Sequence, residues 1–158
     1  MRAPAASVLL ALSVVTAGSV VPSRVAAQPP IAMRSVEHGD QSNIDEAREV
    51  VIRSQAEWEA LWRQHSPDRT RPVIDFGKET VVGVFLGSRT TAGFAVTIVD
   101  VATRDAGLVA RYTVTRPAAG AVTAQVLVFP YHLVAVPSRA GEVRFERVEP
   151  AAGPAGAR

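Results

Sequence analysis

Beyond residue 33, apolar and polar positions alternate in short runs along most of the chain, which is typical of β-strands. In the run LVARYTVT, residues 108–115, every second side chain is apolar and is expected to face a core, while Arg111, Thr113 and Thr115 face water. Runs of this kind indicate antiparallel strands with one wet face, joined by short and mostly hairpin-like connections. The other predicted strands are residues 48–52, 80–86, 94–99, 124–130, 131–137 and 142–148.

One segment repeats its apolar positions with helical spacing instead. Ser54 stands three residues before Glu57, the capping-box pattern of a helix start, and Pro67 closes the segment. The side chains that share one face of this helix are Trp58, Leu61, Trp62 and His65. The sequence therefore predicts a mainly β fold, an antiparallel sheet or sandwich with one early α-helix packed on it.

Trp58 and Trp62 allow two interpretations. At positions i and i+4 they could form a platform on which a ligand stacks, or they could be the buried face of the helix. Leu61 between them favours burial. Replacing either tryptophan with alanine should then destabilise the fold.

The start of the chain has the pattern of a secretory signal peptide. Arg2 precedes an apolar stretch, and small residues at 25–27 offer a cleavage site before Gln28. We expect residues 1–27 to be removed, 28–33 to be a linker, 34–149 to form one β domain and 150–158 to be a disordered tail. The expected location is the periplasm or the extracellular medium, with no transmembrane segment in the mature chain.

Removal of residues 1–27 changes the charge balance. It takes away Arg2 and Arg24, so that 15 basic residues face 15 acidic ones and no basic stripe remains to bind nucleic acid. The chain has no cysteine, which excludes thiol catalysis, cysteine-based metal sites and disulfides. An exported domain without disulfides must be stabilised by its core.

The candidate chemistry of the sequence is sparse. His38 precedes Gly39 in an expected turn, His65 ends the helix, and His132 is expected to be a partly exposed strand residue, although it could flank a pocket near Tyr131. No two histidines have ligand spacing and no serine lies in a nucleophile elbow. We expect no catalytic residue, no metal site and no cofactor.

The insert between the runs 80–86 and 94–99 is the strongest candidate for a binding site. Gly87 and Gly93 bracket Ser88, Arg89, Thr90, Thr91 and Ala92, which fits an exposed loop with closely spaced ends. Two hypotheses stay open: a contact loop, or an ordinary hairpin whose threonines bond to their own backbone.

The same stretch carries a family resemblance. The sequence DFGKETVVGVFLGSRTTAGFAVTIVDV, preceded by AEWEALW and followed by QVLVFPYHLVAVP, resembles the PrcB C-terminal domain family over roughly residues 34–148. That family takes its name from a subunit of a bacterial surface protease complex. The resemblance implies an exported β domain associated with proteolytic complexes.

Two departures from the family pattern fall in the turn. The family usually has Thr-Gly-Gly-Tyr where this chain has Thr91, Ala92, Gly93 and Phe94. Alanine resists a positive φ, so the turn is expected to be reshaped at Ala92. Phe94 also lacks the phenolic hydroxyl of tyrosine.

Three functions follow as hypotheses. The first is a non-enzymatic interaction module, an accessory or regulatory subunit that binds a protein partner such as a protease. The second is a peptidase inhibitor similar to chagasin, which presents the loop from Arg89 to Phe94. The third is a glycan or small-ligand binding domain that uses aromatic side chains. The candidate binding residues are Ser88, Arg89, Thr90, Thr91, Phe94 and Tyr131.

Overall fold

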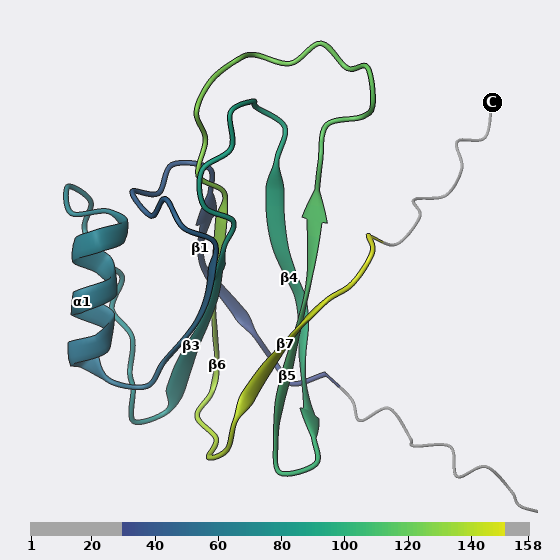
Figure 1. Ribbon diagram of the computed structural model, residues 1–158. Coiled ribbons are helices and arrows are strands. Elements are labelled where there is room, and N and C mark those ends of the chain that lie inside the picture. The colour runs from purple at the N-terminus through teal and green to yellow at the C-terminus, as the bar shows by residue number, and fades with distance from the viewer. Residues whose placement is uncertain (1–29, 151–158) are drawn as a thin grey trace, which may run out of the picture.

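The computed structural model describes residues 30–150, which form three layers: a helix, a four-stranded sheet and a three-stranded sheet (Figure 1). The first sheet has the strand order β1-β6-β3-β2 and the second has the order β4-β5-β7. The elements are β1 (Arg34–Gly39), β2 (Arg48–Ile52), α1 (Gln55–His65), β3 (Glu79–Phe85), β4 (Ala95–Arg104), β5 (Gly107–Thr115), β6 (Tyr131–Pro137) and β7 (Val143–Arg147). The predicted fold class, mainly β with one early helix packed on a sheet, is confirmed.

The helix α1 begins and packs as its sequence predicts. The Ser54 side chain accepts a hydrogen bond from the backbone of Glu57, and the Glu57 carboxylate accepts one from the backbone of Ser54, which completes the capping box. All four side chains of the predicted face are buried against the four-stranded sheet. The helix ends at His65, where Ser66 donates its backbone N–H to the carbonyl of Trp62 at 2.9 Å.

Strands β3 and β6 form the centre of the molecule because both of their faces are covered. On β3, Val81 and Phe85 pack against the helix, while Val82 and Val84 pack between the two sheets. Strand β6 alternates in the same way and pairs with β3 in antiparallel register. Because both faces are covered, the residues of both strands are apolar at nearly every position and show no alternation of apolar and polar side chains.

The second sheet contains one hairpin and one parallel pair. Strands β4 and β5 pair antiparallel, but β7 pairs with β5 in parallel after the chain has crossed from the other sheet. The chain just before β1 also pairs with β4, since Ile31 donates its N–H to the carbonyl of Val101 at 2.8 Å. The expected hairpin-like connections are therefore wrong for most strand pairs, and only β4 and β5 are joined in this way.

Two local predictions are also wrong. The run 124–130 is not a strand, and within it only Val128 makes a β-bridge, with Arg89. His38 lies in strand β1 instead of a turn, and its register partner on β6 is His132. The helix described within residues 30–150 is not long and apolar enough to cross a membrane.

Candidate functional site

Two long connections meet at one end of the sandwich and form what we call the loop lobe, residues 86–94 and 116–130 (Figure 1). The backbones of Arg89 and Val128 exchange two hydrogen bonds of 2.8 Å, and Ala92 donates its N–H to the carbonyl of Ala124 at 3.0 Å. Leu86 donates to the carbonyl of Pro130 at 2.9 Å, which joins the lobe to the β3–β6 pair. The lobe is therefore an irregular extension of two central strands, with its backbone held in place.

Glycines determine how the first connection leaves the sheet. Gly87 has a φ of +70°, and a Cβ there would lie 2.4 Å from the Asp45 carbonyl oxygen. Gly93 has a φ of +92° and lies against the ring of Pro117 in the second connection. Ala92 has no positive φ, so the alanine is accommodated in this turn without backbone strain.

The candidate contact residues differ in exposure. Ser88 and Thr90 are exposed, whereas Arg89, Thr91 and Phe94 are half-buried. The Arg89 guanidinium donates to the Ser88 carbonyl at 2.7 Å and lies 5.8 Å from the centre of the Phe94 ring. Arg89 is thus held over Phe94 by a cation–π contact and is already oriented before any partner binds.

The second connection contributes apolar surface that the sequence analysis did not identify. Val122 is fully exposed, and 48% of Val126 and 60% of Leu127 are exposed. Half of the six exposed large hydrophobic residues in the described part of the chain lie in this connection. Apolar side chains gathered on one protruding feature are typical of a protein-binding surface. The apolar residues of the run 124–130 are typical of a strand, so the sequence alone does not show that they are exposed in a connection.

Tyr131 does not join this surface. Only 2% of it is exposed, and its ring packs against those of His65 and Phe85 beneath the helix. The hydroxyl of Tyr131 accepts a hydrogen bond of 3.0 Å from Arg69, and burial raises the pKa of Tyr131. Trp58 and Trp62 are buried as well, so the glycan-binding hypothesis loses the aromatic platform it needs.

The structure also brings together a serine, a histidine and a glutamate that sequence spacing did not connect. The Ser42 hydroxyl lies 2.8 Å from His65 Nδ1, and Glu37 Oε2 lies 3.4 Å from His65 Nε2. Such a trio could activate a nucleophile in an open site. Here His65 is fully buried and Ser42 is 3% exposed, and burial lowers the pKa of His65. Ser42 Oγ also accepts from Ile44 N at 3.1 Å, so the trio ties the 40–45 segment to the helix end.

His132 has a structural contact of another kind. It is 7% exposed, so the expectation of partial exposure is wrong. Its Nδ1 accepts a 2.9 Å hydrogen bond from the backbone N–H of Ile98, which links β6 of one sheet to β4 of the other. Nε2 therefore carries the proton and lies 3.1 Å from Ser35 Oγ. Burial, assisted by the nearby His38, lowers the pKa of His132 to about 4.

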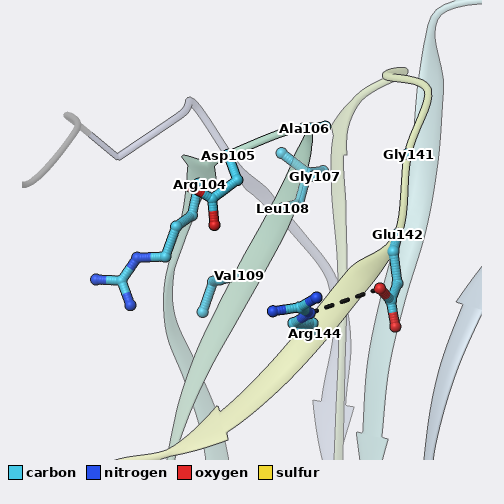
Figure 2. Close-up of a pocket in the computed structure, with 9 residues that line it drawn as sticks. All are labelled: Arg104, Asp105, Ala106, Gly107, Leu108, Val109, Gly141, Glu142 and Arg144. Carbon is cyan, nitrogen blue, oxygen red and sulfur yellow. Dashed lines mark ion pairs between the residues drawn. The ribbon is translucent and has the colours of Figure 1, made fainter.

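Two of the hollows in the described structure lie at the two ends of the second sheet. One, of about 270 Å³, lies at the opposite end of the second sheet, between the β4–β5 turn and the start of β7 (Figure 2). Its acidic and basic side chains are exposed and mixed in sign, with Arg144 paired to Glu142 at 3.5 Å. The other, of about 260 Å³, adjoins the lobe at Phe94. It is lined by His38, Gly39, Asp40, Phe94, Ala95, Val96, Thr97 and Tyr131. No group of three potential metal ligands occurs within residues 30–150.

Comparison with known proteins identifies the central part of the chain. The family model described as PrcB C-terminal matches residues 80–137, which extend from β3 to β6 and include the whole loop lobe. No curated protein and no solved structure matches the chain. The resemblance seen in the sequence is confirmed over residues 80–137, where the chain is similar to the PrcB C-terminal family.

Proposed function

We propose that this chain is an exported protein-binding module, an accessory subunit of a protease complex, and that the loop lobe carries the contact. The family match supports an association with such a complex. The observation that carries the proposal is the exposure of Val122, Val126 and Leu127 beside the oriented Arg89. Aromatic and arginine anchors surrounded by apolar contacts are typical of the residues that dominate binding energy.

The module binds its partner and has no catalytic role in this proposal. The burial of Ser42 and His65 supports that view, because a substrate has no access to a hydroxyl that is almost fully covered. A peptidase inhibitor would use the same lobe, and the rigid backbone of residues 86–94 suits that hypothesis too. The two differ in their effect on the partner, since an inhibitor must abolish proteolysis.

The test is a pull-down of the mature protein from its own culture, with bound proteins identified by mass. A variant carrying Val126→Asp and Leu127→Asp should lose the bound protein, because it places charges in the contact. Val73→Asp is the matched control, since Val73 is 94% exposed and lies in the connection between α1 and β3. Equal capture by both variants would contradict the proposal.

Arg89→Ala tests the anchor itself. If Arg89 is a hot spot, the change should weaken partner binding by about 2 kcal/mol. Because Arg89 is half-buried on the surface, stability should change by no more than about 0.5 kcal/mol. Titration of the captured partner and a urea melt of the same sample measure both quantities. A large loss of stability would mean that Arg89 maintains the lobe and makes no direct contact.

A further inference from the structure

Strand β4 is an edge strand of the second sheet, and one part of its edge is already paired. On one side β4 pairs with β5 along its length. On the other side, Pro30 forms an antiparallel bridge with Ala102, and Ile31 donates to the carbonyl of Val101. This edge therefore accepts an extended segment that runs antiparallel to β4.

The remainder of this edge, residues 95–98, has no strand beside it within residues 30–150. The backbone N–H of Ile98 points away from β5, because it donates to His132 Nδ1 at 2.9 Å. Backbone groups alternate between the two sides of a strand, so the N–H and C=O of Val96 point to the same outer side as Ile98. The groups of Thr97 point toward β5 instead.

The space next to Val96 is open, whereas the outward N–H of Ile98 is already bound by His132. The hollow of about 260 Å³ described above follows residues 94–97 and is bounded across from them by residues 38–40 at the end of β1. His38 is exposed on this side, and Phe94 supplies an apolar wall that continues into the loop lobe. An unpaired edge beside a hollow is a template for an added strand.

We propose that an extended segment of the partner protein adds to the edge of β4 along residues 95–97, antiparallel to it and inside this hollow, and ends before Ile98, whose N–H is bound by His132. The main-chain groups of Val96 would bind the segment's backbone, and Phe94 would contact its side chains. A second copy of this chain could offer only the same few residues of β4, since Pro30–Ile31 covers the edge beyond them. The inference goes beyond the proposed function because it names a second contact surface and the backbone conformation that it recognises.

The probe is a phage-displayed library of random peptides selected on the mature protein, with the best binders then synthesised. Amide hydrogen exchange by NMR follows two neighbouring residues of the wild-type protein. Without peptide, the Val96 amide should exchange quickly and the Thr97 amide slowly. With peptide bound, the Val96 amide should become protected, which side-chain docking on the lobe would not cause.

Val96→Pro removes the outward N–H, and it should weaken peptide binding at least about tenfold. Val96→Ala is the matched control, since it loses a similar amount of packing but keeps the N–H and should keep peptide binding. The lobe variant Val126→Asp with Leu127→Asp should also keep peptide binding. If this variant loses the natural partner but keeps the peptide, the loop lobe carries the partner contact and the peptide binds at a separate place, as the edge proposal requires.

Three results would overturn the edge proposal. The first is that no peptide is selected, or that a bound peptide leaves exchange at Val96 unchanged. The second is a Val96 amide that is already protected in the monomer, which would mean that the chain covers its own edge. The third is a dimer, detected by sedimentation, in which the Val96 amide is protected without peptide.

Discussion

Gly87 stands where the chain leaves β3 for the loop lobe, and its place is determined by the backbone beside it. Its φ is +70°, and a Cβ would meet Asp45 O at 2.4 Å and Ala47 N at 2.7 Å. Backbone atoms cannot move aside as the end of a flexible side chain can. The segment 45–47 therefore requires glycine at this position for two reasons, conformation and space.

We predict that Gly87→Ala destabilises the protein by at least about 2 kcal/mol more than Gly120→Ala does. Gly120 is the matched control because its φ is +78° but a Cβ there would have no neighbour within 4 Å. Gly120→Ala should cost only the conformational penalty, about 1 kcal/mol. Urea denaturation of both variants measures the difference, and equal values would refute the steric argument.

His132 gives the protein a dependence on pH. The folded state holds the pKa of His132 at about 4, against an ordinary value of 6.5, because the ring is buried and His38 lies nearby. A depressed folded-state pKa means that the unfolded chain binds the proton first as the pH falls. The stabilisation is complete above pH 6.5 and is lost progressively toward pH 4, by up to about 3 kcal/mol.

The measurement is the free energy of unfolding between pH 7 and pH 4. In His132→Asn, the amide oxygen can still accept from Ile98 but the group no longer titrates, so the loss should be smaller. His65, whose pKa is also lowered, contributes in the same direction in both proteins. Identical pH profiles for the two proteins would show that His132 is not responsible.

The burial of Tyr131 and His132 could not be predicted from the sequence. A strand with one wet face shows in its pattern which side chains point inward, but β6 is covered on both faces. Nearly every residue of β6 is then apolar, so the sequence pattern does not show what surrounds the rings of Tyr131 and His132. The contact of His132 with Ile98 depends on how two sheets stack, which no local pattern records.

At the scale of elements, the helix was the most predictable part of the fold. Its signals are local, since the capping box and the i, i+4 spacing lie within one short segment. Strand β1 could not be predicted because its residues, RSVEHG, are mostly polar and exposed and it pairs with a neighbour, β6, on one edge only. The run 124–130 has strand-forming residues, but its backbone hydrogen bonds go to scattered partners and form no continuous ladder, so tertiary context overrides its propensity.

We predict that Trp58→Ala and Trp62→Ala each cost about 3–5 kcal/mol of stability. Trp58 is fully buried and Trp62 is 4% exposed. Each indole N–H also donates to a carbonyl of the following connection, that of Pro72 at 3.0 Å and that of Arg69 at 2.9 Å. Val73→Ala in the same connection is the control and should change little. Melting curves like that of the wild type would mean that the helix contributes little to the core.

The candidate site could be predicted only in part, because one of its two connections is polar and the other is apolar. The loop between Gly87 and Gly93 was found because its polar insert interrupts two apolar runs. The partner loop, with Val126 and Leu127, was hidden because apolar residues in a connection look like a strand. The backbone hydrogen bonds of Arg89 with Val128 and of Ala92 with Ala124 show that the two connections are one feature.

For the molecule as a whole, export is a prediction that rests on residues 1–27, which lie outside the described residues. We expect cleavage after Ala27, because an apolar stretch there ends in small residues. Intact mass of the protein recovered from the envelope or the medium measures the cleavage. A mass that still includes residues 1–27 would contradict it, and a chain starting at Gln28 would agree with it.

The strand order of the first sheet has a consequence for the time at which the protein can fold. Strand β1 pairs with β6 and with no other strand of the described chain, so Ser35 and His132, which are 97 residues apart, must meet before that edge exists. Closing so long a loop is slow, and it requires nearly the whole sequence. A chain emerging residue by residue from a ribosome or through a membrane pore therefore has no finished first sheet until β6 has appeared. During that interval the apolar strand β3 lacks its central neighbour, and its unpaired edge and apolar surface are open to association with other chains.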